Sequence, residues 1–164
     1  MQWMFSLLML LAASPVGLWA QMSQEDCRLK AENLEPVICR FNPFFADHQW
    51  KAETRIEMAR MSKERLLVIT QDACKRHHTR LTLIIEASAV EDHPAFWVEE
   101  VKGLMYKAYW QKPEYEVFGR AFEQAFAEKF SLYGVNRRFN FPVGTRNFLC
   151  ELRFQPGKGA KISV

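Results

Sequence analysis

Glycine is scarce in this sequence, with seven among 164 residues, and none lies in the spacing of a phosphate-binding loop. Gly157 and Gly159 are close together, but they fall in a segment that we expect to be a tail. No C-x-x-C pair occurs, which excludes the common zinc and redox modules. No serine lies in a G-x-S-x-G setting, so the nucleophile elbow of a serine hydrolase is also absent. We therefore expect no cofactor, no metal and no evident catalytic activity.

The excess of positive over negative charge is also small. The formal net charge is +3 at pH 7, too small for the dense basic face of a nucleic-acid-binding domain. Instead, the 49% hydrophobic and 25% charged residues are typical of a globular chain, and 13 Phe, 5 Trp and 4 Tyr supply ample material for a core. The length fits one domain, which we place at residues 21–154 with a flexible tail at 155–164.

Residues 1–20 are uncharged and largely apolar, and we interpret them as a signal peptide. Pro15 and Gly17 break the apolar run before Ala20, a small residue that fits cleavage after it. The alternative is a membrane anchor, which needs about 20 continuous apolar residues. No later apolar stretch is long enough to span a bilayer, so we expect a mature chain without a membrane span.

All four cysteines, Cys27, Cys39, Cys74 and Cys150, follow this segment. An even number of cysteines behind a signal peptide is typical of disulfides in an oxidising compartment, so we expect a secreted or periplasmic protein. Three pairings are possible. We favour Cys27 bonded to Cys39 and Cys74 bonded to Cys150, because the first two lie close together in the N-terminal part.

Several segments have the composition of strands. Residues 66–70 and 81–85 are apolar and rich in β-branched side chains, and the polar connector between them predicts neighbouring antiparallel strands. Residues 50–58 alternate in polarity, which favours a third strand of this meander over the competing helix. Residues 37–41 and 148–154 are expected to add an N-terminal and a C-terminal strand.

Two segments have helical spacing. The first is expected to be capped by Asp92 with Pro94 in its first turn, and the second to end at Gly134. The sequence thus predicts an α+β fold: an antiparallel sheet, made of a three-stranded meander plus N- and C-terminal strands, packed by a two-helix hairpin. We assign the Phe stripe of the second helix to the core, with a lipid pocket as the alternative. The stripe consists of Phe118, Phe122, Phe126 and Phe130.

The densest polar cluster lies in the connector after residue 70. Its basic members, which we predict to bind an anionic ligand or an acidic protein surface, are Lys75, Arg76, His77, His78 and Arg80. Arginine suits bidentate contact with carboxylate or phosphate, and like charges so close together repel unless an anion offsets them. Arg137 and Arg138 could join the cluster if the fold brings them near. The alternative is a solvated turn.

The leading interpretation is therefore an exported soluble protein of binding or inhibitor type. The alternative is a small exported hydrolase with a His/carboxylate or metal site around His77, His78 and Asp72. A metal there would need a third ligand from elsewhere, and no spacing in the sequence is diagnostic of one. The candidate third ligands are Glu86, Asp92, His93 and His48.

Overall fold

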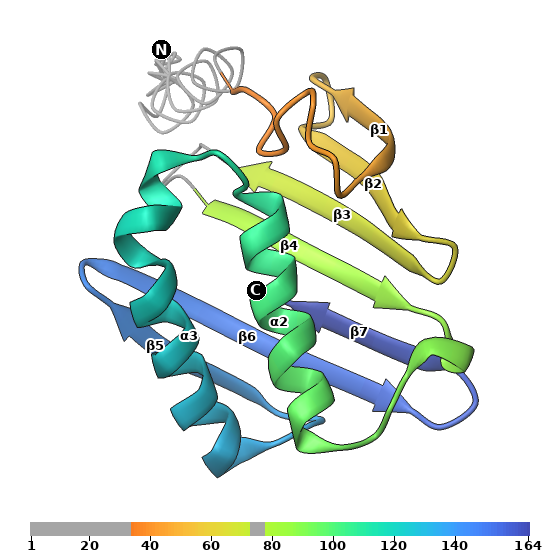
Figure 1. Ribbon diagram of the computed structural model, residues 1–164, viewed down its shortest axis with the longest axis vertical. Coiled ribbons are helices and arrows are strands. Elements are labelled where there is room, and N and C mark those ends of the chain that lie inside the picture. Colours follow the sequence, from red (N-terminus) through yellow and green to blue (C-terminus); the bar gives the residue numbers. More distant parts are fainter. Residues whose placement is uncertain (1–33, 73–77) are drawn as a thin grey trace, which may run out of the picture.

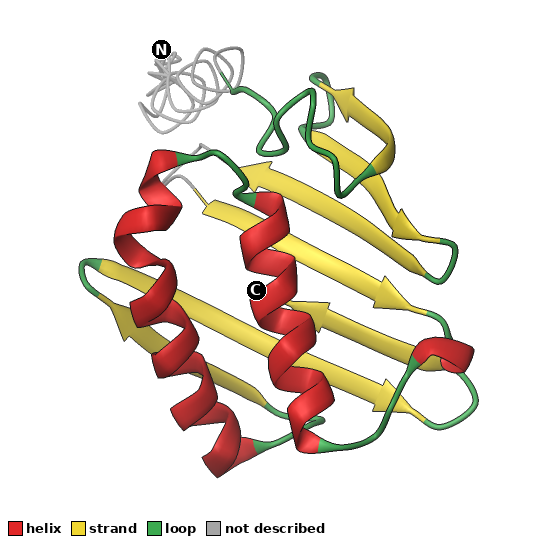
Figure 2. Ribbon diagram, in the orientation of Figure 1, coloured by secondary structure: helices red, strands yellow, loops and turns green. Residues whose placement is uncertain are grey.

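The computed structural model describes residues 34–72 and 78–164. In this part of the chain one antiparallel sheet of seven strands carries two α-helices on one face (Figure 1, Figure 2). The first half contributes the strands β1 (Ala46–Lys51), β2 (Ile56–Ser62), β3 (Arg65–Asp72) and β4 (His78–Ile85). A single 3-10 turn, η1 (Ala87–Ala89), leads to the helices α2 (Pro94–Ala108) and α3 (Pro113–Tyr133). The remaining strands are β5 (Arg138–Val143), β6 (Arg146–Gln155) and β7 (Gly159–Ser163).

The strand order is β1-β2-β3-β4-β7-β6-β5. Two meanders therefore share one sheet, and they meet where β4 pairs with β7. This confirms the predicted α+β class with a two-helix hairpin. The predicted antiparallel neighbours are confirmed too, because Leu66 of β3 lies opposite Ile84 of β4.

The helix ends follow local chemistry. The cap of α2 is His93 rather than the predicted Asp92, and its Nδ1 accepts the N–H of Phe96 at 3.1 Å. Pro94 occupies the first turn, where no intrahelical N–H bond is lost. Gly134 ends α3 with a φ of 68°, as predicted, and donates its N–H to the carbonyl of Phe130.

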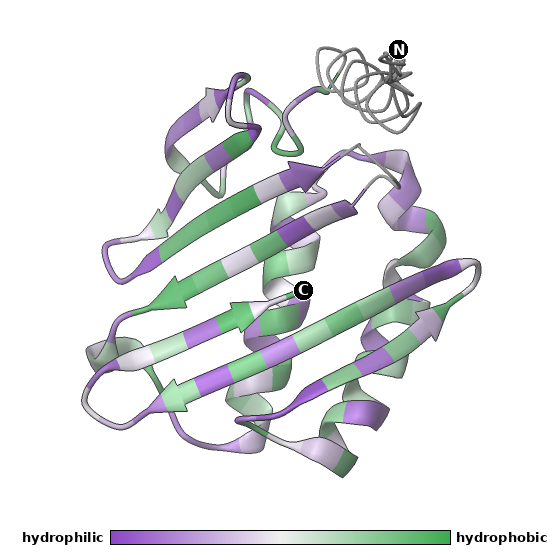
Figure 3. Ribbon diagram, turned by 180° about the vertical axis from the view of Figure 1, so that it is seen from behind, coloured by the Kyte–Doolittle hydropathy of each residue, from purple (hydrophilic) through white to green (hydrophobic). Residues whose placement is uncertain are grey.

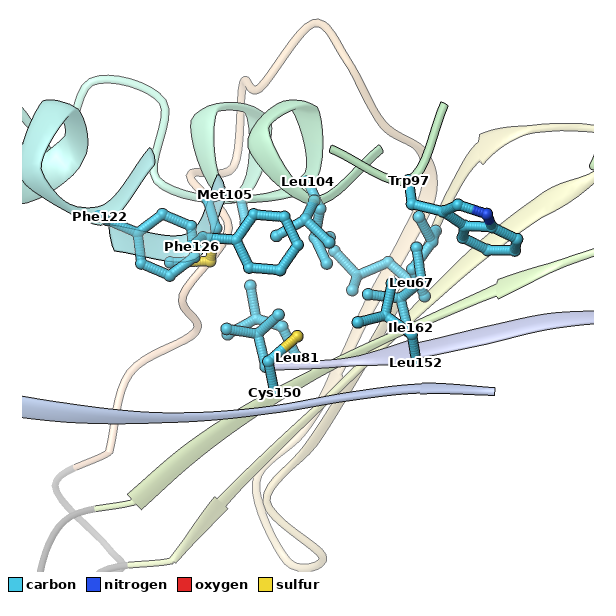
Figure 4. Close-up of a cluster of buried hydrophobic side chains, with 14 of the residues drawn as sticks. Leu67, Leu81, Trp97, Leu104, Met105, Phe122, Phe126, Cys150, Leu152 and Ile162 are labelled. Atoms are coloured by element: carbon cyan, nitrogen blue, oxygen red, sulfur yellow. The ribbon is translucent and has the colours of Figure 1, made fainter. Parts of the chain in front are cut away.

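The core lies between the hairpin and the sheet, and the Phe stripe belongs to it as predicted. Phe122 and Phe126 are 0% exposed, and their rings lie 5.4 and 6.1 Å from that of Phe141 on β5. Figure 4 shows the helix side chains pointing down onto Leu81, Leu152 and other residues of the sheet. On the same face of the sheet, the Arg65 guanidinium of β3 donates to Glu100 of α2 at 2.7 Å, and this contact raises the pKa of Arg65.

Two strand predictions in the N-terminal half are wrong. Residues 37–41 form turns, because the N–H groups of Val37 and Ile38 donate to the carboxylate of Glu57 instead of to a neighbouring strand. Residues 50–58 are interrupted by a turn between β1 and β2, where Arg55 has a φ of 57°. After the turn, the side chains that face the core are no longer those that the continuous alternation predicted. Glu57, which was expected to face water, points inward and is 0% exposed.

The C-terminal prediction also needs correction. Residues 155–164 are not a loose tail, because Gly159–Ser163 form β7 in the interior of the sheet. Ile162 is 0% exposed and lies opposite Leu83 of β4 and Leu152 of β6. The strand expected at 148–154 is present as β6, but β7 separates it from the meander. Of the helices in the described part of the chain, none is long and apolar enough to cross a membrane.

Candidate binding surface

The sheet has one covered face and one open face. Along β4, Leu81, Leu83 and Ile85 are buried under the helices, whereas the alternate residues Arg80 and Ile84 are exposed. Successive side chains of a strand point to opposite faces, so the exposed set lies on the face away from α2 and α3. Figure 3 views this open face, with the helices behind the sheet and no described element in front of it.

On the open face, apolar side chains of β3 and β4 lie next to cations of β7 and β6; we call these parts the apolar half and the basic half, although His78 and Arg80 are further cations on β4. A row of paired residues crosses it from Leu66 on β3 through Ile84 on β4 and Lys161 on β7 to Arg153 on β6. Ile84 is 42% exposed, and Leu66 is half-buried. Hydrophobic side chains thus give way to cations at the junction of β4 with β7.

The basic half contains a shallow groove of about 950 Å³, which we call the basic groove. Its charged lining consists of Arg137, Arg138, Glu151, Arg153, Lys158 and Lys161, and Ile84 and Phe154 are among its apolar residues. The single acid, Glu151, already accepts from Nη2 of Arg153 at 2.6 Å. No other lining cation forms an ion pair within residues 34–72 and 78–164. The groove therefore has an excess of positive charge that nothing in the described chain neutralises.

A second hollow, of about 520 Å³, lies at the free side of β5 and is called here the edge hollow. Its lining combines Tyr133 from the end of α3 with Phe139, Asn140 and Leu149 of the sheet, and Arg138. Arg138 lines both hollows. The basic groove and the edge hollow therefore share this residue in their linings.

The predicted basic cluster is only partly within the described structure. Lys75, Arg76 and His77 lie outside the described residues, whereas His78 and Arg80 are exposed on the open face of β4. Arg138 is on the same face, but β7 and β6 separate it from β4. Three strand spacings of about 4.8 Å put roughly 14 Å between these strands. The structure thus places His78, Arg80 and Arg138 on one face without bringing Arg138 into contact with the other two.

The structure brings together Asp72 and His78 of the alternative hydrolase site, whereas His77 lies outside the described residues and the candidate third ligands are dispersed. Asp72 lies opposite His78 across β3 and β4, and it also faces Arg55 at 3.8 Å. Glu86 follows the opposite end of β4, about 26 Å from His78 at about 3.3 Å per residue. Asp92 and His93 precede α2, where His93 caps the helix. The described residues hold no cluster of three His, Cys, Asp or Glu side chains with metal-ligand geometry.

His48 belongs to a different arrangement. Its Nε2 lies 2.6 Å from Oε1 of Glu57, whose two oxygens also accept the N–H groups of Val37 and Ile38 at 2.8 and 2.9 Å. A buried carboxylate is stable only when it is paired and hydrogen-bonded. Glu57 therefore ties residues 37–38 and β1 to β2, which is a structural role.

Two of the four cysteines are within the described residues. Cys39 and Cys150 are free thiols in the structure, and Cys27 and Cys74 lie outside the described part, so the proposed pairing stays a prediction. Cys150 points from β6 toward the helical layer (Figure 4) and is 0% exposed. Burial, with a smaller contribution from the Glu151 charge, raises the pKa of its thiol to about 12.

Sequence reasoning missed most of the basic groove, because its cations come from the loop before β5 and from β5, β6 and β7. The available signal was the alternation of Glu151 and Arg153 with apolar neighbours, which marks one polar face of a strand. No protein-family model matches the sequence, and comparison with curated proteins and with solved structures found no similar protein.

Proposed function

We propose that this protein is a binding protein that docks an acidic polypeptide on the open face of its sheet. The observation that carries the proposal is the unneutralised basic groove, where Arg137, Arg138, Lys158 and Lys161 have no ion-pair partner within the described residues. Uncompensated cations in a concave surface raise the local concentration of anionic partners. The apolar half adds hydrophobic contacts, which a surface made only of charged side chains does not offer.

A polypeptide fits this surface better than a sulfated glycan or a phosphate. Ile84 is exposed beside Lys161, and half-buried Leu66 and Val68 continue the apolar strip over β3. A protein partner brings hydrophobic side chains together with carboxylates, and exposed apolar patches bordered by polar residues mark protein-interaction sites. A glycan offers only the anions.

Export is part of the same proposal. It is supported by the apolar, uncharged residues 1–20 and by the small residue Ala20 at the expected cleavage position. Intact-mass measurement of secreted material should give a chain that starts at Gln21. A mass that still includes residues 1–20 would favour the membrane-anchor alternative.

The binding proposal is tested by removing charge from the groove. The triple variant Arg138→Gln, Arg153→Gln, Lys161→Gln should weaken binding of fluorescent poly-glutamate at least about tenfold, measured by anisotropy. The matched control, Lys51→Gln, Lys63→Gln, Arg120→Gln, removes the same charge from exposed positions outside the groove and should change binding less than about twofold.

Two results would count against an acidic polypeptide as the partner. Equal weakening by the two triple variants would mean that only net charge matters. A result in which heparin binds more tightly than poly-glutamate, and loses its affinity with added salt as steeply as poly-glutamate does, would support a glycan instead.

A further inference from the structure

The strand β5 is an edge strand whose backbone is open to a partner. It pairs with β6 on one side and with no described strand on the other. Val143 and Arg146 flank the two-residue turn of the β5–β6 hairpin, and residues in this position bond to each other. Because bonded and non-bonded pairs alternate along an antiparallel ladder, the N–H groups of Arg138 and Asn140 point away from β6.

The two edges of the sheet differ in how they are protected. The edge strand β1 has a bulge between Ala46 and Gln49, and Asp47 within it has a φ of 52°; bulges of this kind block strand addition. On β5, Pro142 is at a position whose backbone faces away from β6, and it has no N–H to offer a partner strand. It therefore blocks strand addition only at the end of β5 near the turn. The start of β5 at Arg138 and Asn140 has no such device.

The surroundings of this open segment select an acidic chain. The edge hollow beside it is lined by Tyr133 and Leu149, which are 50% and 37% exposed. Arg138 projects on the open face and also lines the basic groove, and Arg137 precedes it. Arg138 lies opposite Glu151 on β6, and Arg153 follows two residues later on the same face of that strand.

We infer that the acidic partner binds by adding a β-strand to β5 at Arg138–Asn140, with its carboxylates toward the open face and its alternate side chains toward Tyr133. The inference rests on the proposed function and specifies the mode of binding. In strand addition the main-chain hydrogen bonds supply affinity, while pockets for alternate side chains supply specificity.

The test uses amide hydrogen exchange of the full-length protein, followed by NMR, with and without a short peptide in which Glu and Thr alternate. The exchange of the Arg138 and Asn140 amides should slow at least about tenfold in the complex. The amides of Phe139 and Phe141 are internal controls, since they already pair with β6 and should be unaffected. A Gln-Thr peptide is the control for charge.

A backbone variant gives a second measurement. Asn140→Pro removes an outward N–H without removing a charge and should weaken binding of the Glu-Thr peptide about tenfold, whereas Asn140→Ala keeps the N–H and should change it less than about twofold. If Asn140→Pro does not fold, the exchange experiment alone decides.

The outcomes separate the two proposals. A peptide that binds and is weakened by the groove variant, but leaves the exchange of Arg138 and Asn140 unchanged, would overturn strand addition and keep the open face as the binding surface. Absence of binding by both poly-glutamate and the Glu-Thr peptide would overturn the proposed function itself. Equal binding of the Gln-Thr peptide would overturn the acidic character of the partner.

Discussion

Glu57 is a carboxylate without access to solvent, held by the N–H groups of Val37 and Ile38 and by His48. Replacing it with glutamine keeps the shape but turns one acceptor into an NH₂ donor that faces other donors, and it removes the charge beside His48. We expect Glu57→Gln to lower the free energy of unfolding by about 3 kcal/mol, measured by urea denaturation. Glu53→Gln is the matched control, because Glu53 is exposed in the turn after β1, and it should change stability by less than about 0.5 kcal/mol. Equal losses in both variants would contradict the role assigned to Glu57.

Cys150 offers a second measurement on a single residue. Its thiol is buried and its pKa is raised to about 12, so little reactive thiolate exists at pH 8. We expect no alkylation of Cys150 by iodoacetamide in the folded protein and full alkylation in urea without a reductant, measured by peptide mass mapping. Alkylation that requires both urea and a reductant would contradict the free thiol and would support the predicted bond to Cys74.

The strand β7 depends on one glycine. Gly159 has a φ of 96°, and a Cβ atom there would lie 2.2 Å from the carbonyl oxygen of Ile85. We expect Gly159→Ala to lower the free energy of unfolding by more than about 2 kcal/mol, because both the backbone conformation and the contact with Ile85 oppose the methyl group.

A glycine in another element serves as the control for Gly159. Gly103 lies within α2, and nothing is within 4 Å of the position of an added Cβ. Gly103→Ala should raise stability by about 0.5–1 kcal/mol, since alanine is the better helix former. Thermal unfolding of both variants decides, and a neutral Gly159→Ala would mean that residues 157–164 move away from β4 without loss.

At the scale of elements, the sequence was most informative where the determinants are local. The helical hairpin could be predicted because apolar spacing, Pro94 and Gly134 act within a few residues of one another. The segment 37–41 has the composition of a strand, but a distant side chain, Glu57, takes its N–H groups. Residues 155–164 are few and contain Gly, Pro and Lys, so the sequence gave no sign that β7 would pair with both β4 and β6.

The stability of the whole molecule should fall in alkaline solution. Burial raises the pKa values of Cys150, Tyr109 and Tyr115, and the nearby Glu123 carboxylate adds to the effect on Tyr115. These groups hold their protons longer in the folded state than in the unfolded state. Their contribution is therefore complete below about pH 9 and is lost as pH rises through the folded pKa values.

Urea midpoints between pH 8 and pH 12 measure this loss. We expect the decline to be shallower in Tyr115→Phe and in Cys150→Ala, each of which removes one of the titrating groups. The variant Tyr133→Phe is the control, because Tyr133 is half-exposed and does not belong to the set of Cys150, Tyr109 and Tyr115. A decline of the same steepness in all variants would contradict the assignment.

The proposed binding surface is also a property of the whole molecule, and the sequence pointed to only part of it. His78 and Arg80 could be named as candidates because they belong to a dense local cluster. Arg153 and Lys161 were not predicted, and Arg138 was only a conditional member of the cluster, since three strands from two hairpins must be placed side by side before these cations share a groove. Pairing over such long sequence separations depends on the order of strands, which local patterns do not determine.

The pairing of β4 with β7 also affects how the chain is synthesised. Leu81 and Val164 exchange both of their backbone hydrogen bonds, at 2.9 Å each, yet both helices and the strands β5 and β6 lie between β4 and β7 in the chain. On the ribosome, at about 5–20 residues per second, β4 waits several seconds with its inner edge unpaired. Nascent chains are thus exposed to edge-to-edge aggregation before β7 emerges. The yield of folded protein should therefore respond to translation rate and to chaperones more than the stability of the finished sheet would suggest.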